Sequence, residues 1–190
     1  MPAMDPRLEI RTVLRPGDLG AIIAHHGELY GREYRVDSTF EAHVAAAVSA
    51  AGKKGWPGRG EHVRIAEIDG RHAGSIALTD EGDGWAALRF VVLDPELRGQ
   101  GLGRRWIAEL LEAAEADGYI GVRLETFSDL RAAAHIYRSH GFEVISADTA
   151  PRWGRPEITY QRYELNFQSR AQAASSESAG PSERPFSVRA

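Results

Sequence analysis

Hydrophobic and polar positions along the first half of the chain predict two helices between strands. In two segments the apolar residues recur every three or four positions, whereas in the flanking segments they alternate with polar residues or run together. The dipeptide Asp69-Gly70, which separates two alternating segments, indicates a two-residue hairpin turn. The predicted elements are a strand at 8–14, helices at 18–31 and 38–52, and strands at 62–68, 71–79 and 85–93.

Helices and strands alternate in the second half of the chain. Two amphipathic helices are each followed by a glycine, Gly118 and Gly141, which is typical of a helix C-terminus. The first of these helices lies between two strands, so we expect those strands to pair in parallel through a crossover connection. The predicted elements are helices at 101–117 and 129–140 and strands at 120–126, 142–147 and 158–166, with a loop at 148–157 between the last two.

This order of elements predicts an α+β fold with a mixed, mostly antiparallel central sheet and helices on both of its faces. Residues 1–167 are expected to form one domain. From residue 168 onward Ser, Ala, Gln, Glu and Pro predominate, and few large apolar side chains remain to offset the entropy of ordering. The segment 168–190 is therefore expected to be disordered.

The composition argues against nucleic-acid, metal and membrane partners. The net charge of −4 and the pI of about 6.0 do not predict the basic face of a nucleic-acid-binding domain. The chain has no cysteine and no His, Asp or Glu cluster at metal-ligand spacing, so neither disulfides nor a metal site is predicted. The N-terminal residues do not read as a secretory signal and no run of about 18 apolar residues occurs, so we expect no membrane association and a cytoplasmic location.

A glycine-rich segment, Arg98-Gly99-Gln100-Gly101-Leu102-Gly103-Arg104, connects the strand at 85–93 to the helix that follows. Glycines allow backbone N–H groups to turn toward a ligand, and the helix N-terminus adds a positive partial charge. Two arginines, Arg104 and Arg105, open the helix, where a bound polyanion would offset their repulsion from the helix dipole. The segment therefore predicts a pyrophosphate-binding turn.

Two other interpretations of this segment remain open. A dinucleotide-binding turn would have a third glycine where Arg104 stands, and it would follow its strand without the five intervening residues 94–98. Glu125, near the end of the next strand, would suit the ribose in that interpretation. The other interpretation is a helix start without any ligand. It explains less well why three of the five residues 99–103 are glycine, because ordering a glycine costs more conformational entropy than ordering any other residue.

Two sequence motifs resemble the signatures of the GNAT superfamily of N-acetyltransferases. The first is Arg98-x-x-Gly101-x-Gly103 after an apolar strand. The second is the helix residue Tyr137, which is followed by Gly141-Phe142. The two motifs occur in the order and at the spacing typical of the family, and the resemblance covers residues 8–166.

The resemblance implies an acetyl-CoA-dependent N-acyltransferase that moves an acetyl group to a primary amine of a small molecule or peptide by direct attack. The stretches 26–34 and 126–130 look most similar to GNAT domains that are fused to MarR-type regulators, although no winged-helix segment is expected in this chain. A non-catalytic acyl-CoA-binding sensor or regulatory module is the alternative function. The last strands and residues 148–157 could support a homodimer, but no apolar stripe identifies an interface.

The same resemblance implies roles for individual residues. Tyr137 matches the general acid that protonates the departing thiolate, although it could also simply pack on its helix face. Glu125 could act as a base or hold a water relay, or it could pair with Arg89 or Arg123. Leu130 occupies a position where the family commonly has asparagine, which puts the details of coenzyme contact there in question. The implied coenzyme-binding residues are Val91, Val92, Leu93, Arg98, Gly99, Gln100, Gly101, Leu102, Gly103 and Arg104. The implied acceptor-pocket residues are Tyr30, Glu33, Tyr34 and Phe40, of which the first and last could instead belong to the core.

Overall fold

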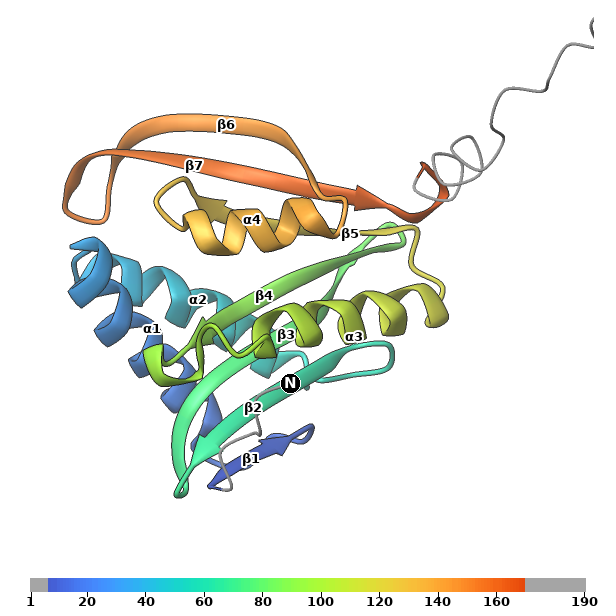
Figure 1. Cartoon of the computed structure of the whole chain (residues 1–190), viewed down its shortest axis with the longest axis horizontal. Helices are drawn as coiled ribbons and strands as arrows, with labels where there is room; N and C mark the ends of the chain where they lie inside the picture. The colour runs from blue at the N-terminus through green and yellow to red at the C-terminus, as the bar shows by residue number, and fades with distance from the viewer. Residues whose placement is uncertain (1–6, 170–190) are drawn as a thin grey trace, which may run out of the picture.

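The computed structural model describes residues 7–169, in which seven strands form one mixed sheet (Figure 1). Neighbouring strands pair antiparallel except for β4 and β5, which pair in parallel. The predicted α+β fold and its parallel pair are therefore confirmed. The strands, in the order in which they lie side by side, are β1 (Leu8–Arg11), β2 (His62–Ile68), β3 (Arg71–Gly82), β4 (Trp85–Leu93), β5 (Gly121–Phe127), β7 (Arg155–Asn166) and β6 (Glu143–Arg152).

Helices cover both faces of the sheet, as predicted (Figure 1). The helices α1 (Asp18–Tyr34) and α2 (Ser38–Lys53) pack on one face and build one hydrophobic core there. The helices α3 (Leu102–Ala116) and α4 (Arg131–Ser139) pack on the other face around a second core, and the short 3-10 helix η1 (Pro95–Leu97) follows β4. Among residues 7–169, no helix has both the length and the apolar character needed to cross a membrane.

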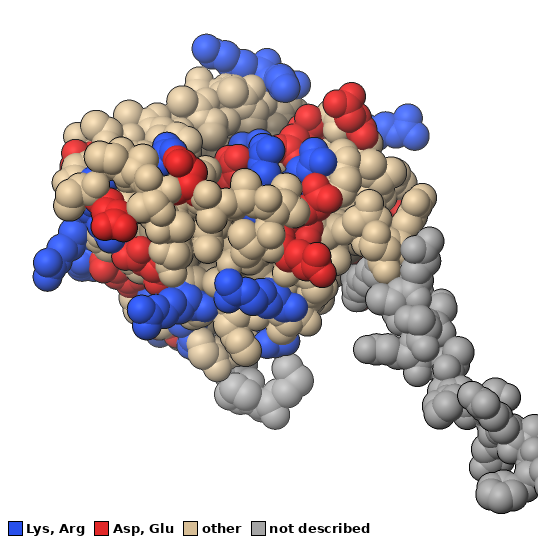
Figure 2. All heavy atoms as spheres, turned by 90° about the horizontal axis from the view of Figure 1, so that it is seen from above, with Lys and Arg blue, Asp and Glu red and all other residues tan. Residues whose placement is uncertain are grey.

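Charged side chains of both signs are mixed on the face of the molecule seen in Figure 2. Lysine and arginine side chains lie next to aspartate and glutamate side chains, with uncharged surface between them. On this face the described residues therefore present no extended surface of one charge, which agrees with the small net charge of −4.

The hairpin of β6 and β7 is longer than the sequence indicated. The expected loop at 148–157 is wrong, because β6 continues to Arg152 and β7 begins at Arg155, with only Trp153-Gly154 between them. Both turn residues have a positive φ, 50° and 74°. β6 is an edge strand whose side chains are largely exposed, so it lacks the alternation of apolar residues that would identify a strand.

Two boundaries near the N-terminus also differ from the prediction. α1 continues past Gly31 to Tyr34, and Arg35 then ends it in the left-handed conformation and donates its N–H to the Gly31 carbonyl at 3.1 Å. The first strand ends at Arg11 rather than at residue 14. The C-terminal segment 168–190, expected to be disordered, lies outside the described residues apart from its first two positions.

Arg11 fixes the end of β1 through a buried ionic cluster. Its side chain is only 5% exposed, and its guanidinium lies 2.7 Å from Asp18 at the start of α1 and 2.8 Å from Glu67 in β2. Burial alone would raise the pKa of Asp18, but hydrogen bonds from Arg11 and from the Arg15 N–H lower it overall. The hydrogen bond from Arg11 also lowers the pKa of Glu67. One arginine therefore pairs with two carboxylates and joins the sheet to α1.

Replacing Arg11 by methionine should lower the free energy of unfolding by about 3 kcal/mol at pH 7, because two largely buried carboxylates lose their partner. Since the folded-state pKa values of Asp18 and Glu67 are depressed, the stabilisation is present above their ordinary values of about 4 and is lost as the pH falls below them. Urea denaturation should therefore give a larger difference between wild type and variant at pH 7 than at about pH 3. Arg15→Met, which removes a 60% exposed arginine nearby, is the control, and an equal loss there would contradict the assignment.

Candidate active site

The strands β4 and β5 separate halfway along their length and open the sheet. Their parallel pairing extends only from Trp85 opposite Gly121 to Leu88 opposite Leu124. In the second half of β4 the register with β3 shifts, and Phe90 has a positive φ of 54°. Such a bulge bends a strand and increases its twist. The bent half of β4 leaves room for a ligand between it and the end of β5.

A cavity of about 350 Å³ lies on one side of this opening. It extends from the last residues of β4 to the glycine-rich turn before α3, with α4 as its other wall. Nine of the ten coenzyme-binding residues implied by the sequence line it, namely Val91, Val92, Leu93, Arg98, Gly99, Gly101, Leu102, Gly103 and Arg104. The tenth, Gln100, does not line it, because its side-chain amide donates to the Glu96 carbonyl at 2.6 Å.

The glycine-rich turn presents backbone N–H groups without helical partners. Gly99 and Gly101 have φ values of 73° and 80°, which glycine adopts without strain. The helical hydrogen bonds of α3 begin with the Arg105 N–H donating to the Gly101 carbonyl at 3.0 Å. The N–H groups of residues 102–104 therefore lack intrahelical acceptors. No acidic residue stands in the first turn of α3 to neutralise this end, so the turn suits an anion.

Arg98 ties this turn to β4 and to α1. Its Nε donates to the Leu93 carbonyl at 2.9 Å, and its Nη1 lies 3.0 Å from the carboxylate of Glu33. Glu33, which the sequence placed in the acceptor pocket, therefore lies beside the glycine-rich turn and lines neither cavity. Tyr34 lines this first cavity rather than the second cavity described next.

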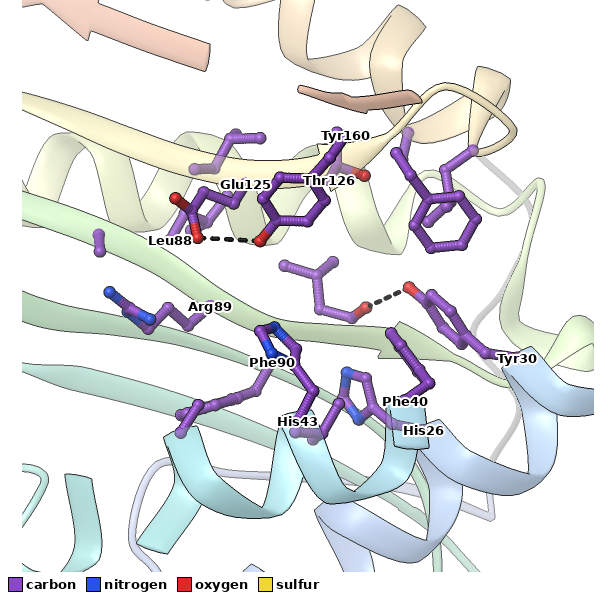
Figure 3. A pocket seen from close by; sticks show the side chains of 18 of the residues that line it. His26, Tyr30, Phe40, His43, Leu88, Arg89, Phe90, Glu125, Thr126 and Tyr160 are labelled. Atoms are coloured by element: carbon purple, nitrogen blue, oxygen red, sulfur yellow. Dashed lines mark hydrogen bonds between the residues drawn. The ribbon is translucent and has the colours of Figure 1, made fainter. Parts of the chain in front are cut away.

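A second cavity of about 170 Å³ lies over the α2 side of β4 and β5 (Figure 3). Aromatic side chains from α2, β5, β7 and the β6–β7 turn form its wall: the ring of Trp153 lies 5.0 Å from that of Phe40, 5.8 Å from that of Phe127 and 5.9 Å from that of Tyr160. The two cavities meet at the opening between the strands, where five residues line both: Tyr30, Val91, Leu130, Ala133 and Tyr137.

Tyr137 lies at this junction on α4. Its side chain is 4% exposed, and its ring packs 6.0 Å from the rings of both Phe142 and Tyr163. Burial raises the pKa of Tyr137, so its hydroxyl stays protonated at neutral pH. Within the described residues no hydrogen bond is formed by this hydroxyl, which leaves its proton available to a group in either cavity.

Tyr30 both packs in the core and shapes the junction. Its ring stacks on Phe40 at 5.0 Å, and its hydroxyl donates to the Val91 carbonyl at 3.2 Å. Burial raises the pKa of Tyr30 as well, so it remains a hydrogen-bond donor. Of the residues that the sequence placed in the acceptor pocket, Tyr30 and Phe40 thus line the second cavity while also belonging to the core.

Glu125 faces the second cavity from β5, but with partners other than the two considered from the sequence. Its carboxylate accepts a hydrogen bond from the Tyr160 hydroxyl at 2.9 Å and lies 3.3 Å from Arg162 (Figure 3). Arg123 pairs instead with Glu164 at 2.9 Å. A carboxylate held in this way can still accept a proton through water, since the side chain is 40% exposed.

The second cavity also contains polar residues that the sequence did not indicate. His43 from α2, Arg89 from β4, Trp153 from the β6–β7 turn and Tyr160 from β7 all line it. They come from distant segments, so no local motif could have identified them. His26 lines the cavity too, but it bonds to the Ile22 carbonyl at 2.8 Å, and burial lowers its pKa to about 4, which keeps it neutral at pH 7.

The glycine turn and the junction tyrosine belong to the two motifs that resemble the GNAT signatures in the sequence. Residues 28–142 match the acetyltransferase (GNAT) family. The chain is 27% identical to an N-acetyltransferase of Schizosaccharomyces pombe over 140 residues, which cover 72% of this chain and 83% of that protein. The chain therefore belongs to the GNAT acetyltransferase family.

Solved structures show the same fold. An acetyltransferase from Streptococcus agalactiae superposes with a TM-score of 0.64 at 19% identity, covering 86% of this chain and all (100%) of that one. A structure from Salmonella typhimurium that contains its cofactor acetyl-CoA superposes with a TM-score of 0.59 at 20% identity, covering 84% of this chain and 93% of that one.

Proposed function

We propose that this protein transfers the acetyl group of acetyl-CoA to a primary amine of a small molecule or peptide by direct attack. The observation that carries the proposal is the position of Tyr137, a buried and protonated hydroxyl without a partner among the described residues, where the two cavities meet. In this arrangement the larger cavity holds the coenzyme and the smaller one holds the amine.

The chain supplies a distinct contact for each part of the coenzyme. The N–H groups of residues 99–104 bind the diphosphate, aided by the dipole of α3. The part of β4 that β5 leaves unpaired, at Val91, Val92 and Leu93, lies along the pantetheine arm. The thioester then reaches the junction, where a backbone N–H of β4 polarises its carbonyl oxygen and stabilises the oxyanion. The acetyl-CoA in the Salmonella typhimurium structure supports this choice of co-substrate.

The reaction requires two proton transfers in addition to the attack. The amine nitrogen forms a bond to the thioester carbonyl carbon, and the carbon–sulfur bond then breaks. Tyr137 donates its proton to the departing sulfur, and the amine proton passes through water to Glu125. Holding both reactants at one junction supplies much of the rate gain, because the attack becomes effectively intramolecular.

A thermal-shift comparison followed by an amine panel tests this proposal. Acetyl-CoA at about 100 times its Kd should stabilise the protein by about 2.7 kcal/mol and raise the Tm by roughly 5–10 °C, whereas NAD should not. Release of free CoA thiol should then be observed with at least one amine of the panel. A shift with NAD alone would indicate a nucleotide-binding oxidoreductase. Coenzyme binding without turnover of any amine would instead support a non-catalytic acyl-CoA sensor.

A further inference from the structure

Two arginines line the acceptor cavity, and they differ in their partners. Arg123 has partners within the protein. It forms an ion pair with Glu164 at 2.9 Å, and it stacks over Trp85 with 3.9 Å between its guanidinium carbon and the ring centre. The side chain of Arg89 makes neither an ion pair nor a hydrogen bond with any residue of the described segment 7–169. A half-buried guanidinium without a counterion is unfavourable, so this part of the cavity is complementary to an anion.

The position of Arg89 connects this anion site to the reaction centre. Arg89 stands two residues before Val91 on β4, just past Leu88, the last residue that pairs with β5. It therefore projects from the part of the strand that borders the opening, and it lies toward the same end of the cavity as Glu125 (Figure 3). Glu125 does not neutralise it, because that carboxylate is held by Tyr160 and Arg162. Two residues of strand, roughly 7 Å, separate Arg89 from the junction at Val91, and a ligand together with the Arg89 side chain has to span this distance.

The remaining cavity wall limits the size and character of the ligand. The volume of this cavity, about 170 Å³, is below the roughly 300–1,000 Å³ typical of pockets for drug-sized molecules. The aromatic rings of Phe40, Phe127, Trp153 and Tyr160 form an apolar wall that suits an apolar or aromatic side chain. An arginine fork binds a carboxylate through two parallel hydrogen bonds.

We propose that the acceptor is a free amino acid with an apolar or aromatic side chain, whose carboxylate pairs with Arg89 while its amine reaches the junction at Val91 and Tyr137. This inference rests on the proposed acetyltransferase function. A free amino acid carries its amine and carboxylate a few ångströms apart, and the long side chain of Arg89 can span the rest of the roughly 7 Å of strand between Arg89 and the junction. A peptide carries its N-terminal amine far from its C-terminal carboxylate and cannot satisfy both groups in a cavity of this size.

Pairs of acceptors that differ only in the carboxylate test this inference. The pairs are L-phenylalanine with phenethylamine and L-tryptophan with tryptamine, and kcat/KM is measured by release of CoA thiol. Each value is referred to the concentration of neutral amine, so that differences in amine basicity do not enter. The wild type should prefer the carboxylated member of at least one pair by tenfold or more.

Variants of Arg89 show whether this residue binds the carboxylate of the acceptor. R89M should lower kcat/KM for the amino acid at least tenfold, mainly through KM. The ratio of kcat/KM for the amino acid to kcat/KM for the matching amine should then fall to about three or less. R89K should retain an intermediate preference, because it keeps the charge without the fork. R59M, at an exposed arginine that lines neither cavity, should match the wild type. The thermal shift caused by acetyl-CoA should be equal in all four proteins, which excludes a general structural defect.

Each other outcome overturns the inference in a recognisable way. If the amines without a carboxylate react as well as the amino acids, or if R89M keeps the preference, the inference fails while the acetyltransferase function stands. If no amine or amino acid is acetylated although acetyl-CoA binds, the proposed function fails and the inference fails with it.

Discussion

Replacing Gly101 by valine should weaken acetyl-CoA binding at least 100-fold. Gly101 has a φ of 80° and caps α3, so a β-branched residue there forces the turn out of its conformation. A Cβ at this position would meet no protein atom within 4 Å, so the substitution acts through the backbone conformation of the turn rather than through the packing of the protein. Isothermal titration with acetyl-CoA measures the change.

Gly118 offers a matched control on the same helix. It follows the C-terminal end of α3 with a φ of 87°, and a Cβ there would also meet nothing within 4 Å. Gly118→Val should therefore cost a similar amount of stability, about 1–2 kcal/mol, and leave coenzyme affinity unchanged. Gly103→Val, in the first turn of α3 and lining the coenzyme cavity, should lose binding as Gly101→Val does. Micromolar binding by both Gly101→Val and Gly103→Val would contradict the assignment of the turn.

Replacing Tyr137 by phenylalanine should lower kcat at least tenfold with little change in the Kd for acetyl-CoA. The substitution removes only a hydroxyl that has no hydrogen-bond partner among the described residues, and the ring can keep its packing against Phe142 and Tyr163. A general acid typically contributes about 10²–10⁴-fold to the rate. Steady-state kinetics with the best amine of the panel, together with titration of the coenzyme, separate the two effects.

Tyr119→Phe is the control for this prediction, because Tyr119 is a partly buried tyrosine that lines neither cavity. It should retain wild-type turnover. Burial raises the pKa of Tyr137, so the wild type should keep its acid function through the neutral and mildly alkaline range. Unchanged turnover in Tyr137→Phe would show that this tyrosine only packs on its helix.

The lining of the larger cavity could largely be predicted from the sequence because many of its residues are local. The turn at 98–104 lies within one short segment, and glycine spacing, the preceding apolar strand and the following helix are all visible there. Tyr137 with Gly141-Phe142 is likewise a local motif. Such motifs predict which backbone groups face a ligand without knowledge of the tertiary fold.

The lining of the smaller cavity could not be predicted because it is assembled from distant segments. Arg89 and Glu125 lie on different strands, and Trp153 reaches the cavity through a hairpin that the sequence suggested was a loop. The pairing of Glu33 with Arg98 joins residues 65 positions apart, and it holds Glu33 beside the glycine-rich turn. The bulge at Phe90, which places Arg89 beside the opening, has a positive φ at a residue that is not glycine, and no sequence pattern marks it.

A crystal structure with acetyl-CoA bound is the most direct test of this account. It should place phosphate oxygens about 3 Å from N–H groups of residues 99–104 and the thioester sulfur within hydrogen-bonding reach of the Tyr137 hydroxyl. A coenzyme bound elsewhere on the protein, with side chains occupying the turn, would contradict both the site and the chemistry assigned to it.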